Sequence, residues 1–117
     1  MTSHTLAEQV DSLLSDFDRV EPVTFDLGTP ELPEVGAIHE LVNMGAEIVP
    51  LLLERIQSSG SKKRIAYIVL VLNRIGDTKV LAPLLDLRAR YQDLETKDEW
   101  DYAVIGQCNL AIEQLQK

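Results

Sequence analysis

Apolar residues recur along most of this chain at the three-to-four-residue spacing of helices, with polar residues between them. This pattern predicts a first helix over residues 6–17, where Thr5 followed three positions later by Glu8 has the form of a capping box. The same spacing predicts a helix over 46–57, another after Gly76-Asp77 to about residue 91, and a last one over 97–115. Thr96 and Glu99 would form a capping box at the start of that last helix. A helix over 62–75 is assigned from its context instead. We therefore expect an all-α fold.

The segment between residues 20 and 33 interrupts this pattern. It contains three of the five prolines and no sustained helical spacing, so it is predicted to be a connector. Val23, Phe25 and Leu27 alternate with polar residues, as in a segment that lies extended across the body of a protein.

The helix after the connector is expected to run from about residue 30 to residue 44, with Thr29 as its N-cap. It should end there because Gly45 can adopt the left-handed conformation that closes a helix. Pro50 falls in the opening turns of the 46–57 helix. An interior proline removes a hydrogen bond, so this helix must begin irregularly or just before the proline.

Two segments of the chain resemble each other. Residues 41–52, LVNMGAEIVPLL, and residues 72–85, LNRIGDTKVLAPLL, each place a glycine before an apolar stretch that contains a proline. The prolines are 33 residues apart and the glycines 31, close to the period of stacked helical hairpins. We expect one domain, a short α-solenoid of about six helices. Its parts would be an N-terminal cap helix and connector (1–31), two antiparallel hairpins (32–57 and 61–91) and a terminal helix (97–115).

Residues 65–72 are eight consecutive apolar residues, rich in isoleucine and valine. Such a run fits a buried strand as well as a helix. No second strand-like run is present to pair with it, and an isolated strand would leave its backbone groups without hydrogen bonds in the interior. We therefore assign the run to a helix that is packed on several sides, at the centre of the stack.

Residues 45–52 and 75–85 resemble HEAT-like repeats, including the subtype found in phycobilisome bilin lyases. The resemblance spans roughly residues 32–91, with a divergent final helix from residue 97. Arg64 stands where such repeats often carry an arginine early in the first helix of a pair. The resemblance implies a solenoid in which the second helix of each pair lines the concave side. It leaves the function open, because the family includes scaffolds, regulators, chaperone-like proteins and a few enzymes.

Charge is divided sharply along the 117 residues, whose net charge is −8. Residues 1–34 carry eight acids and one base, whereas residues 55–90 carry eight bases and two acids. In one interpretation the two segments lie over each other in the fold or form solvated faces. In the other, the basic segment forms a surface for an acidic partner.

Composition bears on the cellular setting. The single cysteine excludes an internal disulfide, so a reducing cytoplasm is expected. The sequence shows no signal-peptide pattern and no apolar stretch near the ~20 residues needed to cross a bilayer. We therefore expect a cytoplasmic protein without a membrane partner.

No catalytic pattern is complete. His39 and Glu40 begin the zinc-protease pattern, but Asn43 stands where the second histidine ligand is required. Cys108 lies on the expected inner face of the last helix without a nearby base, as a packed, unreactive thiol would. The acids at the start of that helix are expected to be capping and dipole partners: Asp98, Glu99 and Asp101. We expect no metal and no cofactor.

These observations favour a non-catalytic module that binds another protein, as an adaptor, a regulator or an acidic inhibitor whose N-terminal acids contact a basic partner. Self-association is a further option. Nucleic acid is not expected as a partner, because the chain is acidic and its bases are not interleaved with aromatic residues. The predicted contact residues are polar positions of the expected concave helices and the basic run: Glu47, Glu54, Arg55, Lys62, Lys63, Arg64, Lys79, Asp86 and Arg90.

The rival hypothesis follows from the resemblance. It is a bilin lyase subunit or chaperone-like factor that holds a tetrapyrrole during attachment to a phycobiliprotein. Trp100, Tyr102 and the basic residues would then contact the rings and propionates. Two and a half repeats are few for a groove that buries such a ligand, so the chain would need a partner subunit or self-association.

Overall fold

Helices make up nearly all of the regular structure, as the apolar spacing predicts. The computed structural model describes residues 5–20, 23–24 and 30–116. The Cα radius of gyration, 13.9 Å, is close to the ~13 Å expected of a compact domain of this size. The elements in chain order, with η for 3-10 helices, are α1 Leu6–Phe17, β1 Val23–Thr24, β2 Pro30–Glu31, α2 Gly36–Met44, η1 Gly45–Ile48, α3 Val49–Ser58, α4 Lys62–Ile75, η2 Thr78–Val80, α5 Leu81–Gln92 and α6 Glu99–Leu115.

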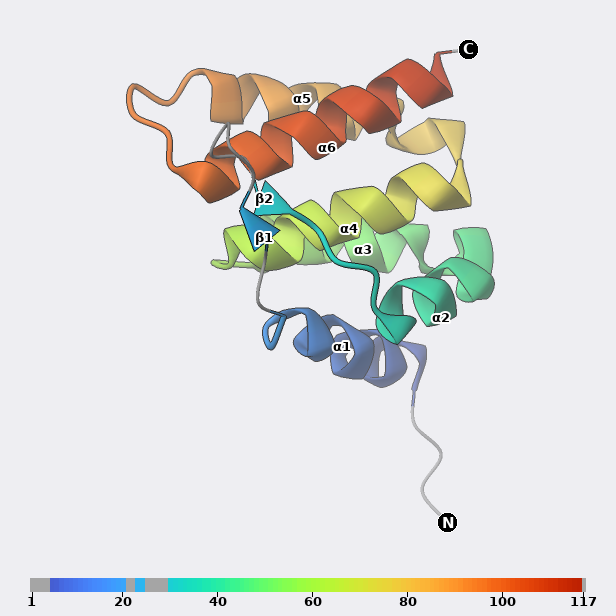
Figure 1. Cartoon of the computed structure of the whole chain (residues 1–117). Helices are drawn as coiled ribbons and strands as arrows, with labels where there is room; N and C mark the ends of the chain where they lie inside the picture. Colours follow the sequence, from blue (N-terminus) through green and yellow to red (C-terminus); the bar gives the residue numbers. More distant parts are fainter. Residues whose placement is uncertain (1–4, 21–22, 25–29, 117) are drawn as a thin grey trace.

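The helices lie in three tiers (Figure 1). α1 and α2 form the lowest tier, α3 and α4 the middle one, and α5 and α6 the top one. α4 contacts α1, α2, α3 and α6, while α5 packs mainly on α6. The fold is therefore all-helical and compact. The hairpin and solenoid arrangement stays a prediction, and so does the number of helices, since α2, η1 and α3 follow one another without interruption.

α1 begins and ends where the sequence predicts. The hydroxyl of Thr5 accepts a hydrogen bond from the backbone N–H of Glu8 at 3.1 Å, which is the N-cap bond of the predicted box. Val10, Leu14 and Phe17 are fully buried. These three residues form the apolar stripe that packs α1 onto the rest of the fold.

α2 begins at Gly36, so the prediction that it starts near residue 30 is wrong. Residues 30–31 instead form β2, which pairs antiparallel with β1. Pro33 disfavours helical backbone at Leu32, so a helix cannot run from residue 30 through Pro33, although Pro33 itself could be a first helical residue. Three residues of the predicted connector and cap lie outside the described part of the chain: Phe25, Leu27 and Thr29.

The two similar segments fold into the same local structure. In each, a helix ends at a glycine of positive φ, a 3-10 turn follows, and the next helix carries a proline in its first turn. The left-handed conformation predicted for Gly45 is wrong: its φ is 73° but its ψ is −158°, outside that region, although a positive φ still favours a residue without Cβ. Gly76, predicted only as a turn, is the glycine with the left-handed conformation, at φ 77° and ψ 23°. Pro50 is tolerated because α3 begins at Val49.

α4 lies at the centre of the fold, with the predicted bounds. Seven of its residues are buried: Ile65, Ala66, Tyr67, Ile68, Val69, Val71 and Leu72. The assignment of the 65–72 run to a helix is confirmed. Burial on several sides follows from its contacts with helices in all three tiers.

α6 is capped two residues later than predicted. Its N-cap is Asp98 rather than Thr96. Asp98 accepts a hydrogen bond from the backbone N–H of Asp101, and the Asp101 carboxylate accepts one from the backbone N–H of Asp98, both at 2.9 Å. A carboxylate is a stronger acceptor than a hydroxyl at the positive end of a helix. The capping role predicted for these two acids is confirmed.

The helical run Gly36–Ser58 is, among the described residues, long and apolar enough to cross a membrane by length and composition alone. The sequence-based prediction missed it because it divided the run at Gly45. In the fold the 3-10 turn η1 lies between α2 and α3, and both of these helices contact α4. Core helices of water-soluble proteins meet the same criterion.

Candidate functional site

The charged segments that are separate in the sequence lie against each other in the fold. Arg55 on α3 donates through Nε and Nη2 to the two carboxylate oxygens of Asp11 on α1, at 2.7 and 3.1 Å. Arg64 on α4 binds Asp18, just after α1, through the same two nitrogens. Paired bonds of this kind fix the relative orientation of both groups. The interpretation that acidic and basic segments lie over each other is confirmed.

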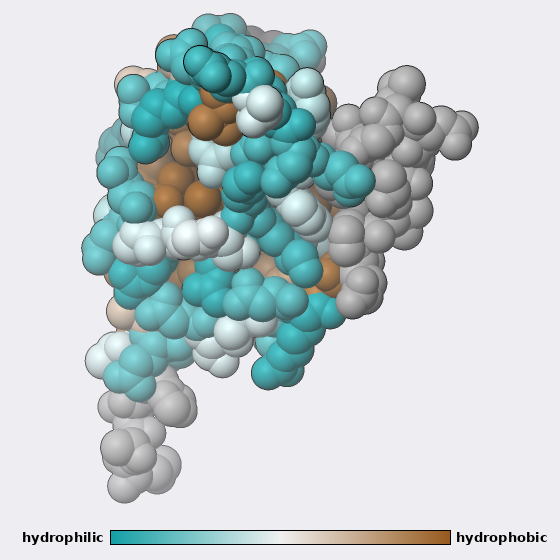
Figure 2. Space-filling view, turned by 90° about the vertical axis from the view of Figure 1, so that its left-hand side faces the viewer, coloured by the Kyte–Doolittle hydropathy of each residue, from teal (hydrophilic) through white to brown (hydrophobic). Residues whose placement is uncertain are grey.

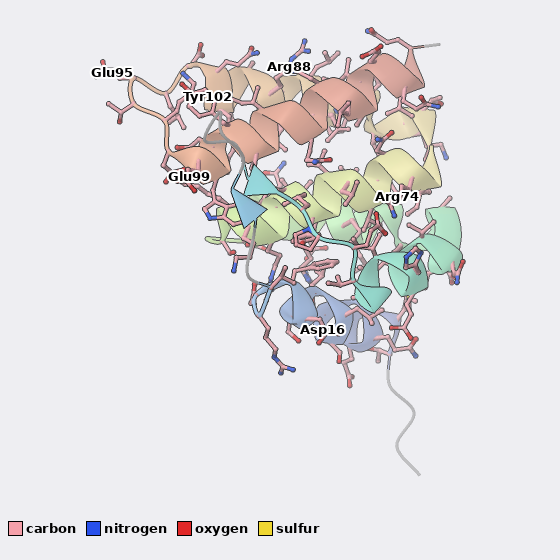
Figure 3. The ribbon with its side chains drawn as sticks, viewed as in Figure 1. Asp16, Arg74, Arg88, Glu95, Glu99 and Tyr102 are labelled. Atoms are coloured by element: carbon pink, nitrogen blue, oxygen red, sulfur yellow. The ribbon has the colours of Figure 1, made fainter. Side chains whose placement is uncertain are left out.

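A third arginine holds the residues that lead into α2. Arg74, which lies on α4 (Figure 3), binds both carboxylate oxygens of Glu34. Nε2 of His39 lies 3.2 Å from the same carboxylate. The hydrogen bond from Arg74 lowers the pKa of Glu34. The hydroxyl of Tyr67 donates to the carbonyl of Pro33 at 3.0 Å. Burial, aided by the charge of Glu34, raises the pKa of Tyr67 to about 12, so the phenol stays a neutral donor.

Lys62, the first residue of α4, binds the start of α6. Its Nζ lies 2.9 Å from Oδ2 of Asp98 and 3.1 Å from Oδ1 of Asp101. Hydrogen bonds to Asp98 and then Asp101 raise the pKa of Lys62, and the bond from Lys62 is the main cause of a lowered pKa at Asp98. Asp101 is 3% exposed, so Lys62 balances a buried carboxylate.

Lys63 connects the end of α1 with α6. Its Nζ donates to the carbonyl of Val20 at 2.8 Å and lies 5.7 Å from the ring centre of Trp100. Tyr102 is half exposed, whereas Trp100 is partly buried against the core. Residues two positions apart on a helix point about 200° apart around its axis. Trp100 and Tyr102 therefore do not face one ligand together.

The predicted contact residues fall into two groups. Four are partly buried and bind groups of this chain: Arg55, Lys62, Lys63 and Arg64. The other five are exposed on η1, α3, η2 and α5: Glu47, Glu54, Lys79, Asp86 and Arg90. Of these, Glu54 pairs with Arg55, and Asp86 with Arg90 along α5. A partner on the α3 and α5 side, behind α4 and α6 in Figure 1, stays a prediction.

The charge left exposed on the lowest tier is acidic. Asp16 and Glu40 are exposed acids of α1 and α2, and Glu8, which accepts a hydrogen bond from the hydroxyl of Thr5, is another. Among the described residues of that tier, an exposed base is Arg19, which lies just after α1. Sequence reasoning left these acids out of the predicted contact residues, although the charge imbalance of residues 1–34 pointed to them.

A groove of about 670 Å³ lies between α1 and α2. Its acidic lining residues are Glu8, Asp11 and Glu40, and its apolar ones, both partly exposed, are Leu13 and Met44. Gln9 and Ser12 complete the lining. No basic side chain lines this groove among the described residues, so it combines an apolar strip with negative charge.

A smaller hollow of about 390 Å³ lies where α4 and α6 begin and α5 ends. Figure 2 looks toward this end of the molecule and shows hydrophobic residues surrounded by hydrophilic ones. The lining of the hollow includes Lys62 and Asp101, which already bind each other. It also includes Tyr91, whose pKa is raised by burial and then by the charge of Asp101. Lys62 and Asp101 of this hollow join α4 to α6, and Arg90 pairs with Asp86 along α5.

Cys108 is fully buried on α6, and burial raises the pKa of its thiol to about 12. At pH 8 only about one such thiol in 10⁴ is ionised, against roughly one in four for an exposed cysteine. We expect a dithionitrobenzoate reagent to modify Cys108 at least about a hundredfold more slowly in the folded protein than in urea. The measurement is the absorbance of the released thiolate, with the unfolded protein as control. Similar rates in both states would show that the thiol is accessible.

Among the described residues, no group of three or more His, Cys, Asp or Glu side chains is placed to hold a metal ion. Comparison of the chain with protein-family models, with curated proteins and with solved structures returned no match. The HEAT-like resemblance therefore rests on the residues that carry it.

Proposed function

We propose that this chain is a non-catalytic protein-binding module, an adaptor, regulator or acidic inhibitor, that recognises a basic partner. The observation that carries the proposal is that the basic residues of α3 and α4 bind groups of this same chain. Arg55, Lys62, Arg64 and Arg74 bind carboxylates of this chain, and Lys63 binds its carbonyl groups. These bases hold the tiers together, and the lowest tier presents acids to solvent. An acidic surface attracts a positively charged protein and repels nucleic acid.

The scaffold of the proposed module is a HEAT-like stack. Local structure and helix contacts both support this stack. In their local structure, both similar segments form a helix, a glycine turn, a 3-10 turn and a proline-containing helix. The first helices of the two segments, α2 and α4, are in contact, and α4 is in turn in contact with α6. α1 covers the end of this series, as a capping helix does in a solenoid. A reducing cytoplasm suits the single, buried thiol.

Capture of partners from a lysate of the native source tests the proposal. Tagged protein is incubated at about 0.1 M and about 1 M salt, between which the Debye length falls from about 10 Å to about 3 Å. We expect a specific partner of high isoelectric point, identified by mass spectrometry, that is retained at low salt and released at high salt. An absorbance scan of the eluate accompanies the measurement, because bound pigment would favour tetrapyrrole attachment instead.

Matched charge reversals sharpen this test. Asp16→Lys with Glu47→Lys alters exposed acids on α1 and η1, and Glu95→Lys with Glu113→Lys alters exposed acids in the top tier by the same charge. We expect the first pair to weaken capture by about fivefold or more, because each reversal places a like charge before the partner. The second pair should leave capture within about twofold. An absence of any basic partner, or capture insensitive to salt, would contradict the proposal.

A further inference from the structure

We propose that the groove between α1 and α2 is the docking site of this module, and that its occupant is a cationic amphipathic helix of the partner protein. This inference rests on the proposed function and gives it a site. The helix would lay its apolar side on Leu13 and Met44 and place lysines or arginines beside Glu8 and Glu40.

The lining of the groove specifies the chemistry of the occupant. Leu13 and Met44 are partly exposed and belong to the residues that pack against the hydrophobic core, so an apolar side chain placed here continues that core. Methionine is flexible and adapts its shape to a bound apolar group. Glu8 and Glu40 come from the two different helices and are both exposed. A segment that lies between them meets negative charge on both sides.

The position of the groove favours a helix as the occupant. α1 and α2 are in contact and form the lowest tier of the molecule (Figure 1). A groove between two contacting helices accepts the ridge of a third, as in ordinary helix packing and in helix-in-groove recognition. Asp16 lies farther along α1, on its exposed side, and extends the acidic surface beyond the groove (Figure 3).

Charge argues against a second copy of the chain as the occupant. The net charge is −8, and α1 and α2 carry exposed acids, so two such surfaces would repel each other. A basic segment is complementary to the same surface.

The probe is a fluorescent peptide of about 15 residues in which leucines repeat at helical spacing and lysines fill the other positions. Its binding to the full chain is followed by fluorescence anisotropy. Two control peptides keep its length: one has the same composition with the leucines scattered around the helix, and one has glutamate in place of lysine. We expect saturable binding of the first peptide, at least about tenfold weaker binding of the scattered one, and no binding of the acidic one.

Matched variants locate the site. Glu40→Lys reverses the charge of one rim and Met44→Gln makes the floor polar, and we expect each to weaken peptide binding by about fivefold. Glu113→Lys and Leu110→Gln make the same changes at exposed positions of α6, where Leu110 is 56% exposed, and should stay within about twofold. Thermal unfolding of each variant verifies that it is folded. Amide chemical-shift mapping with the peptide gives a second measure of the site and should move resonances of α1 and α2.

Equal losses in groove and control variants would overturn the groove as the site, because binding would then depend on total charge. The inference also fails if the peptide does not bind or if its shifts map to other helices. In these cases, capture of a basic partner from lysate that Glu40→Lys leaves unchanged would still support the proposed function. The contact with that partner would then lie on another surface. Dimerisation of the free chain in sedimentation experiments, lost in Met44→Gln, would assign the groove to a second copy and overturn the inference.

Discussion

Replacing Phe17 by alanine is expected to lower the free energy of unfolding by about 3–5 kcal/mol. The ring is fully buried and stacks on Tyr67, with ring centres 4.3 Å apart and planes within 2°. Its loss removes apolar burial, leaves a cavity and breaks the aromatic contact between α1 and α4. A domain of this size is stable by only ~5–15 kcal/mol, so the variant would lose a large share of its stability.

Urea unfolding followed by circular dichroism measures this loss. Tyr67→Phe serves as a matched variant, because it keeps the stacked ring and removes only the hydrogen bond to Pro33; about 1 kcal/mol is expected. Ser12→Ala, at an exposed position of α1, should change stability by less than about 0.5 kcal/mol. A Phe17→Ala protein as stable as the parent would show that α1 does not pack on α4 as described.

Replacing Lys62 by alanine is expected to cost about 2–3 kcal/mol. The substitution leaves the buried carboxylate of Asp101 without the cation that lies 3.1 Å from it. Removing one partner of a buried ion pair typically costs ~3–5 kcal/mol. The smaller value applies because 40% of the Lys62 side chain is exposed and solvent screens part of the charge.

A double-mutant cycle isolates this interaction. Asp101→Asn keeps an oxygen that can accept the capping bond from the backbone N–H of Asp98, and it removes the buried charge. We expect Lys62→Ala to be clearly less costly when Asp101 is already asparagine, with a coupling of about 1 kcal/mol or more in urea unfolding. Additive effects of the two changes would mean that Lys62 does not balance the charge of Asp101.

Charge reversal in the basic run 62–64 is a poor test of partner binding. Glutamates at these positions would face Asp18 and Asp101 of the same chain. Like charges in these contacts weaken the attachment of α1 and α6 to α4. Loss of a partner in such a variant would follow from loss of the fold, so exposed acids are the better positions for charge reversal.

Helices whose limits depend on local chemistry could be predicted from the order of residues alone. α1 has the predicted bounds because its apolar spacing of period 3.6 and the hydroxyl cap at Thr5 are read within a few residues. α4 has them because its apolar run had no second strand-like run to pair with. Local chemistry also placed the turn at Gly76. The errors were local too: Pro33 delayed the start of α2, and Asp98 displaced Thr96 as the cap of α6.

The roles of the charged side chains, by contrast, depend on how the helices pack. Arg55 binds Asp11 across 44 residues, Arg64 binds Asp18 across 46, and Arg74 binds Glu34 across 40. Helical periodicity carries no information on contacts at such separations, because they depend on how whole helices pack. The sequence showed that acids and bases were segregated, and the fold showed that the bases hold the tiers together. The acids left exposed beside the groove of α1 and α2 are the result of that packing.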